Sequence, residues 1–323
     1  MSYKIVLSLI VLCAASWAAQ SHAQGDAYPA KPVRVVVPYT PGGGNDILAR
    51  IVVARAVSDM GRTTIVDNRP GGNTSIGTQV VARSAPDGYT LLTVDNAYTT
   101  APSVQPNLPY DTVKDFARVT MMARTSPILV VHPSVPVKSL KELIALAKRQ
   151  PGQLVFGSTG SGATAHLAFA QLKLVTGMDA IHVPYKGGSP QVTALLSGEV
   201  SMLIAVPAGL LPHIKAGRMR PLAVSGSKRL TALPALPTFT EAGVPVTVDA
   251  FWGLVAPAGT SPAIVSRLQE AIDRALKYPE VSSRLDEMQF QAVGSTPAQF
   301  ETFVQGEVTR WMGIVKAAGI KVD

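Results

Sequence analysis

Early in the chain, the spacing of apolar and polar residues changes from that of a buried strand to that of a helix. Residues 33–37 form a short apolar run rich in valine, which is typical of a buried parallel strand. Pro41 and the three glycines after it interrupt the run, and apolar residues then recur at helical spacing over 47–54. Asn45 or Asp46 can cap this helix. The pattern predicts a strand, a glycine turn and a helix whose first N–H groups can bind an anion, or else a tight turn without a ligand.

The same arrangement recurs further along the chain. Residues 63–67 and 89–94 are predicted strands, and residues 76–83 are a predicted helix. A second polar glycine turn, residues 68–75, joins the first of these strands to the helix. Alternating strands and helices indicate a parallel sheet with helices on both faces. Such sheets bind ligands at the carboxyl ends of their strands, where both glycine turns lie.

A second series of strands and helices follows an irregular, proline-rich passage at 101–118. It begins with the apolar segment 121–132, which is interrupted at 124–127 and is expected to leave one domain and enter another. Small-residue turns at 158–164 and 185–190 each lead from a strand into a helix. The predicted strands of this half are residues 154–157, 180–184, 200–206 and 221–225, and its predicted helices are 140–149 (opened by a Ser-x-x-Glu capping box), 165–175 and 191–196.

From residue 251 the chain is expected to return to the first half. A strand at 251–256 precedes helices at 262–276 and 280–288. Thr296 and Gln299 form a capping box that opens a long terminal helix ending near Gly319. The apolar stripe of this helix is expected to cover the sheet of the first half, and consists of Phe300, Phe303, Val304, Trp311 and Ile314.

These elements predict an α/β protein of two lobes joined by a two-segment hinge. The predicted boundaries assign residues 25–124 and 246–323 to lobe 1 and residues 125–245 to lobe 2. A cleft between such lobes is a natural small-molecule site. With 323 residues, of which 47% are hydrophobic and 15% charged, the chain can form two packed cores and does not have the composition of a disordered protein.

The N-terminal residues predict export. Lys4, the apolar run 5–15 and the small-x-small sequence 21–23 have the pattern of a cleavable signal peptide over residues 1–23. The run is shorter than the roughly 18 residues that a membrane anchor needs. Cys13, the only cysteine, lies in this segment, so the mature chain would hold no disulfide. We therefore expect a soluble periplasmic protein, and lipid attachment at Cys13 is an alternative that the leucine before it disfavours.

Charge and motifs limit the function classes. Loss of Lys4 with the signal lowers the formal net charge from +8 to +7, which favours anionic partners, whereas 6% aromatic residues and no basic cluster argue against nucleic acid. No metal, nucleotide or nucleophile-elbow motif occurs, and no cofactor is expected. Ser158 and Ser161 are expected to be hydrogen-bond donors rather than nucleophiles. The dispersed histidines of the mature chain are expected to be structural: His132, His166, His182 and His213.

Eight short motifs occur in order along the chain, at residues 28–34, 36–46, 68–71, 85–92, 108–111, 182–188, 211–217 and 251–259. Together they resemble the Bug family of extracytoplasmic solute receptors, which serve tripartite tricarboxylate transporters. The resemblance covers essentially the whole mature chain. It implies a type II periplasmic-binding-protein (flytrap) fold that closes on a carboxylated solute and then docks on the membrane components of a transporter. We expect the receptor to be a monomer.

The resemblance also implies which residues bind the solute, because backbone amides and small hydroxyls of the glycine turns hold the carboxylates in family members. In lobe 1 the implied residues are Thr40, Gly42, Gly43, Asn45 and Asp46, and in lobe 2 they are Ser158, Thr159, Ser161, Ala163 and Thr164. Tyr39, Asn96, Tyr185 and Lys186 are further candidate ligand-binding residues. Asp46 is expected to cap its helix rather than to touch a carboxylate. Lys186 is either the counter-charge of the solute or an exposed loop lysine, and the role of Arg69 is equally open.

Three departures from the family pattern concern which solute fits. Residues 201–206 lack the acidic residue and the Phe-Asp pair that relatives usually carry there. A carboxylate in the cleft would suit an ammonium group, so its absence weighs against an amino-acid solute. Residues 68–75 carry side chains where the family has glycines. Residues 95–98 replace a stretch that in the family is commonly small and polar and ends in histidine. Tyr98 in this stretch either narrows the cleft, stacks on a flat solute or simply packs in a core.

Three functions are compatible with the sequence. The leading one is a periplasmic receptor that delivers a small carboxylate to a tripartite tricarboxylate-type transporter. The second is a sensor subunit that presents its ligand to a signalling partner. The third is a periplasmic enzyme on the same scaffold, since a fold does not fix a function.

Overall fold

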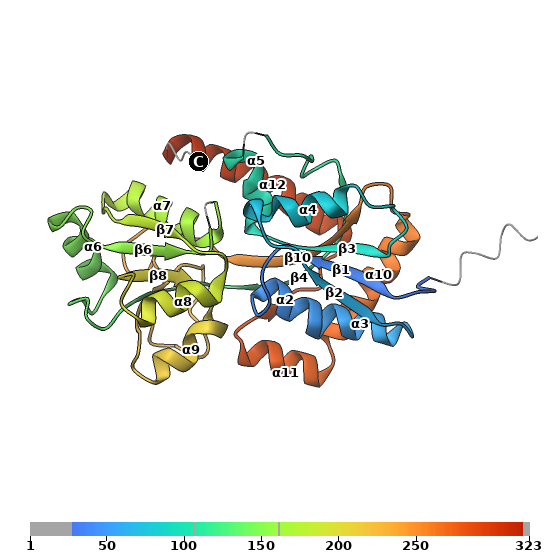
Figure 1. The fold of residues 1–323 in the computed structure, drawn as a ribbon. Coiled ribbons are helices and arrows are strands. Elements are labelled where there is room, and N and C mark those ends of the chain that lie inside the picture. The colour runs from blue at the N-terminus through green and yellow to red at the C-terminus, as the bar shows by residue number, and fades with distance from the viewer. Residues whose placement is uncertain (1–27, 106, 161, 319–323) are drawn as a thin grey trace, which may run out of the picture.

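Two α/β lobes, each built around one sheet, make up the protein (Figure 1). The computed structural model describes residues 28–318 apart from 106 and 161, so the predicted signal peptide, Cys13 and Ser161 lie outside the described residues. The strands of lobe 1 are β1 (Val33–Val37), β2 (Thr64–Asn68), β3 (Thr90–Asp95), β4 (Phe116–Thr125), β10 (Ala250–Pro257) and β11 (Gln291–Ala292). Those of lobe 2 are β5 (Ile128–Val131), β6 (Val155–Ser158), β7 (Ile181–Pro184), β8 (Met202–Ala205) and β9 (Arg220–Val224).

The sheet of lobe 1 has the strand order β11-β4-β10-β3-β1-β2. β1 is parallel to β2 and β3, as the alternating pattern predicts. β10 runs antiparallel between β3 and β4, with Trp252 opposite both Asp95 and Ala123. The sheet is therefore mixed rather than purely parallel, because β10 enters it from lobe 2 in the opposite direction.

Lobe 2 has the strand order β7-β6-β8-β5-β9. β6 is parallel to β7 and β8, while β5 is antiparallel to β8 and β9. The chain enters this lobe through Ser126 and Pro127, between β4 and β5, and leaves it before β10. Val246 and Val248 still pack in the core of lobe 2. The exact boundaries at 124/125 and 245/246 stay a prediction.

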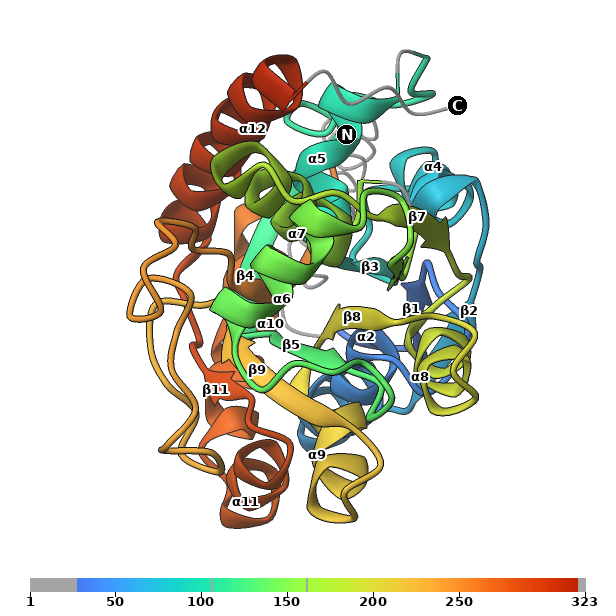
Figure 2. The same ribbon diagram turned by 90° about the vertical axis from the view of Figure 1, so that its left-hand side faces the viewer.

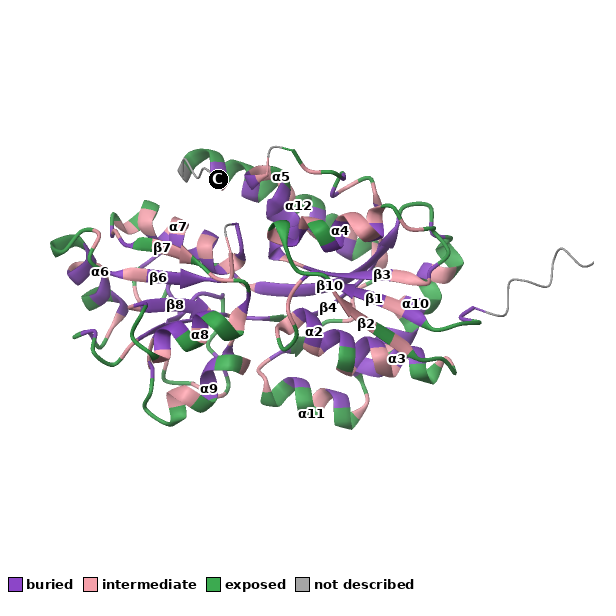
Figure 3. Ribbon diagram, viewed as in Figure 1, coloured by how far each residue is buried: buried purple, intermediate pink, exposed green. Residues whose placement is uncertain are grey.

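Helices cover both faces of the lobe 1 sheet (Figures 1 and 2). One face carries a continuous helical run of α2 (Gly44–Leu48), the π-helical turn η2 (Ala49–Val53) and α3 (Ala54–Asp59), together with α10 (Pro262–Leu276) and α11 (Pro279–Glu287). The other face carries α4 (Ser75–Ala82), α5 (Asn96–Val104) and α12 (Pro297–Ala318), with the 3-10 turn η3 (Gly72–Thr74) before α4. Val35 and Val36 of β1 face opposite sides, and both are fully buried (Figure 3). Burial on both faces explains the unbroken valine run.

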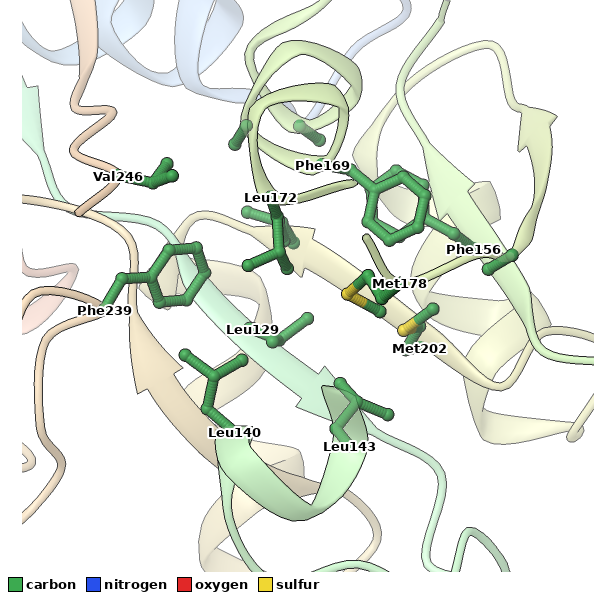
Figure 4. Close-up of a cluster of buried hydrophobic side chains, with 14 of the residues drawn as sticks. Leu129, Leu140, Leu143, Phe156, Phe169, Leu172, Met178, Met202, Phe239 and Val246 are labelled. Carbon is green, nitrogen blue, oxygen red and sulfur yellow. The ribbon is translucent and has the colours of Figure 1, made fainter. Parts of the chain in front are cut away.

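The helices of lobe 2 are α6 (Leu140–Arg149), α7 (Thr164–Thr176), α8 (Gly188–Leu196) and α9 (Pro207–Lys215). The core that α6 and α7 cover is drawn in Figure 4, where Phe156 and Phe169 stack with ring centroids 4.1 Å apart. None of the helices within 28–318 is both long and apolar enough to cross a membrane.

The predicted capping box at 296–299 is confirmed, whereas the one at 139–142 is only half formed. The Glu142 N–H donates to Ser139 Oγ at 3.2 Å, but the Glu142 carboxylate accepts from the Lys138 N–H at 2.8 Å rather than from Ser139. At the start of α12 the bonds are reciprocal: the Gln299 N–H donates to Thr296 Oγ1 at 3.2 Å, and the Thr296 N–H donates to Gln299 Oε1 at 2.9 Å. These side chains supply partners for N–H groups that the first turn of a helix leaves free.

Some elements differ from the sequence prediction. α5 lies partly in the passage predicted to be irregular, and α9 was not predicted at all. α5 contains Pro102, which ordinarily argues against a helix, but Asp95 caps it by accepting the Ala97 N–H at 3.0 Å. The first helix begins at Gly44, so Asn45 and Asp46 lie inside it and neither caps it.

The terminal helix α12 does not lie on lobe 1 alone, which corrects the sequence prediction. Phe300 and Val304 pack against the sheet of lobe 1, as expected. Trp311 and Val315 instead belong to the core of lobe 2, and Trp311 is fully buried there. One helix thus spans both lobes on the side of α5 and α7 (Figure 2).

Candidate functional site

A cavity of about 550 Å³ lies between the two lobes. Turns at the carboxyl ends of β1, β3, β6, β7 and β8 form much of its wall. From lobe 1 the lining residues are Tyr39, Thr40, Pro41, Gly42, Gly43, Gly44, Asn45, Ile47, Asp95, Asn96, Ala250, Trp252, Met288 and Phe290. From lobe 2 they are Pro127, Thr159, Thr164, Ala165, Gly187, Gly188, Ser189, Gln191, Val192, Thr193, Leu196, Ile204, Ala205, Val206, Ala208, Gly209 and His213.

The first glycine turn contributes the wall of lobe 1, as the sequence predicts. Gly42 has a φ of +89°, a conformation that favours glycine. A Cβ on Gly44 would lie 2.6 Å from the indole of Trp252, whereas a Cβ on Gly43 would meet nothing within 4 Å. Glycine at 44 therefore lets the helix begin directly against the indole, with Gly43 facing open space.

Asp46, one of the candidate ligand-binding residues, does not line the cavity. Its buried carboxylate accepts hydrogen bonds from the Gly42 N–H at 3.0 Å, from Asn68 Nδ2 at 3.0 Å and from Arg50. Burial alone would raise the pKa of Asp46, but these bonds hold it below its usual value. The ionised side chain fixes the turn from behind, so its role is to position the turn.

Asp95 lines the cavity although the sequence did not single it out for the site. Its Oδ1 accepts from the Tyr39 hydroxyl at 3.1 Å and from the Ala97 N–H at 3.0 Å, and its Oδ2 accepts from Asn45 Nδ2 at 2.9 Å. Burial raises the pKa of Asp95, and these hydrogen bonds oppose the rise. Asp95 thereby orients Tyr39 and Asn45, two of the predicted ligand-binding residues.

Asn96 and Tyr98 follow Asp95 on α5 and have different positions. Asn96 lines the cavity and is tied to the hinge strand, since it donates to the Asp249 carbonyl at 3.0 Å and accepts from the Phe251 N–H at 3.1 Å. Tyr98 is buried, bonds the Thr112 carbonyl at 2.6 Å and does not line the cavity. Of the three predicted roles for Tyr98, core packing is the one that the structure shows.

In the turn after β6, Thr159 and Thr164 line the cavity, whereas Ser158 and Ala163 do not. Ser158 is fully buried, and its Oγ lies 2.6 Å from His182 Nε2. It also accepts from the Gly160 N–H at 3.1 Å. Ala163 is the buried N-cap of α7. Both residues are buried behind the turn and do not line the cavity.

His182 and His166 form a stacked pair behind this turn. Their rings are nearly parallel, with centroids 4.1 Å apart. His166 Nδ1 accepts from the Gly162 N–H at 3.0 Å. Burial, the neighbouring His166 and Lys173 lower the pKa of His182 to about 4. Both imidazoles are therefore neutral at pH 7. Ser158, which bonds His182, is buried and does not line the cavity.

The turn at 185–190 meets the cavity with other residues than those predicted. The side chains of Tyr185 and Lys186 do not line it. Tyr185 bonds Glu199 Oε1 at 2.7 Å, and Lys186 contributes its carbonyl, which accepts from Thr40 Oγ1 at 3.2 Å. Gly187, Gly188 and Ser189 line the cavity instead. The start of α8, rather than the lysine, is the part of this turn that can face a solute.

Three helices begin at the cavity wall with N–H groups that their own turns leave free. They are the run starting with α2, α7 and α8, which line the cavity through residues 43–45, 164–165 and 187–189. The positive ends of helix dipoles reinforce such donors for an anion. The N-terminus of α5 differs, because Asp95 already occupies it. Main-chain donors from both lobes thus converge on one space.

Among the hydrogen bonds that join the lobes, two lie next to the glycine turns. Thr40 Oγ1 donates to the Lys186 carbonyl at 3.2 Å, and Thr100 Oγ1 donates to the Gly162 carbonyl at 2.8 Å. Thr100 is fully buried. The lobes are therefore in contact on either side of the glycine turns, as in a closed flytrap.

Comparison with known proteins identifies the family. The family model described as tripartite tricarboxylate transporter family receptor (TctC) matches residues 48–320. The chain belongs to this family. Among curated TctC-family relatives, Protein BugT of Bordetella pertussis is 35% identical over 320 residues, which is 98% of each chain. The resemblance to Bug receptors seen in the sequence is confirmed.

Solved structures of TctC-type receptors have the same fold. An R. palustris protein solved with adipate superposes with a TM-score of 0.87 at 35% identity, covering 91% of this chain and 99% of that one. MatC of Rhodopseudomonas palustris, with bound malate, gives a TM-score of 0.85 at 29% identity, with coverage of 89% and 100%. The two-lobed periplasmic-binding-protein fold is therefore confirmed.

The cavity of this TctC-family receptor includes residues that sequence reasoning missed. Asp95 precedes a helix directly after a strand, and this capping pattern is a local signal that could have identified it. Gln191 lies in the first turn of α8, one residue after the motif that was singled out. Trp252 and Phe290 come from separate segments of the C-terminal third, and nothing local marks them as cavity residues.

Proposed function

We propose that this chain is a periplasmic receptor that captures a small carboxylate-bearing solute between its lobes and delivers it to a tripartite tricarboxylate-type transporter. Residues 1–23 direct its export and are then cleaved off. The mature receptor acts as a monomer and releases the solute unchanged. Its membership of a family of periplasmic solute-binding receptors supports the first part of this proposal.

The convergence of helix N-termini carries the proposal. Residues 43–45, 164–165 and 187–189 bring free main-chain N–H groups from both lobes to one cavity. Such N–H groups bind carboxylates and do not react with them. Two structural neighbours, solved with adipate and with malate, hold carboxylates. Within the described residues no three His, Cys, Asp or Glu side chains gather to hold a metal ion.

Thermal unfolding of the mature protein with a panel of organic acids, each paired with its uncharged amide, tests solute capture. A ligand at a hundred times its dissociation constant adds about 2.7 kcal/mol to the folded state, which raises the midpoint by about 5–10 °C. We expect shifts with acids and none with amides. The scan is repeated on refolded protein, which carries no retained solute. If no acid shifts the midpoint of the refolded protein, carboxylate capture is wrong.

Export and delivery need separate tests in cells. The mass of protein from the periplasmic fraction is expected to correspond to a chain that starts at Gln24. Deletion of the gene is expected to abolish accumulation of the labelled acid, and a plasmid copy is expected to restore it. Unchanged accumulation in the deletion strain would contradict the transport role and leave solute capture intact.

A further inference from the structure

Part of the cavity wall is largely apolar and carries no charged side chain. Trp252 and Phe290 meet there edge to face, with ring centroids 4.8 Å apart, and both are buried. Ile47, Leu196 and Met288 line the same cavity with partly exposed apolar side chains. A solute group that fills this part gains by burying apolar surface, whereas a charged group there loses its hydration without a partner.

No lysine or arginine side chain lines the cavity among the described residues. The ionisable groups on its wall besides Tyr39 are Asp95 and His213. Asp95 already accepts hydrogen bonds from Tyr39, Asn45 and the backbone of α5. Burial and the nearby Arg218 lower the pKa of His213, so this ring is neutral at pH 7. The helix N-termini can hold a carboxylate, but a second one placed in the apolar part would have no charged partner.

Two buried side-chain oxygens on the wall have no hydrogen-bond partner among the described residues. One is Asn45 Oδ1: because Asn45 Nδ2 donates to Asp95, the free atom of this amide is its acceptor. The other is Gln191 Oε1, from the opposite lobe. Asn45 is 3% and Gln191 1% exposed. Buried polar atoms are nearly always paired, so both oxygens call for a donor that the protein does not supply.

Both side chains belong to helical turns that line the cavity. Asn45 belongs to the first turn of the helix that starts with α2, and Gln191 to the first turn of α8. The free N–H groups of these same turns are the carboxylate donors described above. A donor on the solute that reaches either oxygen therefore sits next to the carboxylate.

We propose that the solute is a monocarboxylic acid with an apolar body of ring size and a hydroxyl group on the carbon next to the carboxylate. This inference rests on the proposed function. The carboxylate lies at the helix N-termini, the hydroxyl donates to Asn45 Oδ1 or Gln191 Oε1, and the body covers Trp252 and Phe290. Dicarboxylates of the malate type are disfavoured, because their second charge faces the apolar wall.

Four matched probes test the inference on the refolded mature protein by titration calorimetry. Mandelate has all three features, phenylacetate lacks the hydroxyl, malate replaces the ring by a second carboxylate group, and phenylglycine replaces the hydroxyl by an ammonium. We expect mandelate to bind about tenfold tighter than phenylacetate, which is the usual worth of one hydrogen bond. We expect it to bind at least about a hundredfold tighter than malate, since a buried charge is left unpaired there.

Each contrary result has a distinct meaning. Malate binding as tightly as mandelate overturns the inference and leaves the carboxylate receptor standing. Phenylglycine binding tighter than mandelate overturns the hydroxyl assignment in favour of an ammonium. If neither these acids nor any acid of the thermal panel binds, the proposed function fails together with the inference.

Three variants provide an independent test. Gln191→Leu removes an amide that bonds no described residue, and we expect the preference for mandelate over phenylacetate to fall by severalfold with unchanged stability. Leu196→Arg places a cation on the apolar wall and is expected to shift the preference towards malate by about tenfold or more. Leu174→Arg, at a leucine of α7 that is 56% exposed and outside the cavity, is the control and should change neither ratio. Unaltered ratios in the first two variants would contradict the assigned geometry.

Discussion

Gly43 and Gly44 illustrate how much two neighbouring residues of the same type can differ. Both belong to a motif that the sequence singles out, and both line the cavity. Only Gly44 is pressed against a side chain, the indole of Trp252, which the sequence could not reveal because Trp252 lies more than two hundred residues away. The motif predicts the turn, and only the fold explains each glycine.

Gly44→Ala is therefore expected to lower the free energy of unfolding by about 1–3 kcal/mol, the usual cost of overpacking. Gly43→Ala is the matched control and should change it by less than about 0.5 kcal/mol, because its Cβ would meet nothing within 4 Å. Urea unfolding of the solute-free proteins measures both. Equal losses in the two variants would contradict the close contact at Gly44.

The stacked histidines of lobe 2 predict a pH dependence of stability. The pKa of His182 is about 4 in the folded protein against an ordinary 6.5, so the unfolded chain binds more protons between these values. Stability is then fully present above pH 6.5 and falls as the pH drops towards 4. Between pH 7 and pH 5 the contribution of His182 to this loss is on the order of 1 kcal/mol, because the ring is only partly buried and solvent screens its interactions.

His182→Gln should reduce the difference in unfolding free energy between pH 7 and pH 5 by about that amount. His132→Gln serves as the control, since His132 lies outside this pair and bonds Ser134 instead. The comparison is made within each variant, so a general loss of stability does not affect it. A pH dependence that the His182 substitution leaves intact would show that other groups cause it.

Individual site residues could be predicted only where a local pattern marks them. Thr40, Asn45, Thr159 and Thr164 lie on the cavity wall as the glycine-turn motifs implied. Lys186 and Ser158 belong to the same motifs, but their side chains do not line the cavity. A motif predicts the path of the backbone, whereas the direction of each side chain depends on neighbours such as Glu199 and His182, which pack from other strands and turns.

At the scale of elements, α12 is the part that the sequence predicted least completely. Its start and apolar stripe follow from the capping box and the helical period, and the predicted end at Gly319 lies outside the described residues. The stripe does not reveal that Phe300 packs on one lobe and Trp311 on the other. α5 was missed because Pro102 and two threonines have low helix propensity, and buried packing stabilises the helix despite them. Both cases show tertiary contacts deciding what local propensity leaves open.

Trp311→Ala is expected to lower the free energy of unfolding by about 3–5 kcal/mol, because it empties a fully buried site in the core of lobe 2. The adjacent Met312, which is 51% exposed, is the matched control, and Met312→Ala should cost less than about 0.5 kcal/mol. Chemical denaturation followed by far-ultraviolet circular dichroism measures both, because this signal reports helix content and does not rely on the substituted tryptophan. A small effect of Trp311→Ala would contradict the docking of α12 on lobe 2.

On the scale of the whole molecule, function depends on the approach of the two lobes. Thr100 is buried at their contact and donates to the Gly162 carbonyl across it, whereas the neighbouring buried Thr99 bonds only the Asn96 carbonyl of its own helix. The two-lobe plan could be predicted from the repeated strand-helix pattern and the return of the chain at β10. The hydrogen bonds between the lobes could not be predicted, because no local sequence pattern shows how one lobe is positioned against the other.

Thr100→Val is expected to weaken binding of the acid that stabilises the protein most by about 0.5–1.5 kcal/mol, since closure loses one hydrogen bond. Thr99→Val removes a comparable bond that does not cross the cleft, and affinity should stay unchanged. Titration calorimetry measures both dissociation constants. Equal weakening by both variants would indicate a general effect on α5 rather than on closure.

The most direct measurement for the account as a whole is a crystal structure of the mature protein with the acid that gives the largest thermal shift. The account predicts that the carboxylate oxygens lie about 2.7–3.1 Å from main-chain nitrogens at the starts of α2, α7 or α8. No lysine or arginine side chain should contact them. A carboxylate held by a basic side chain, or bound outside the cavity between the lobes, would contradict the central claim that helix N-termini form the anion site.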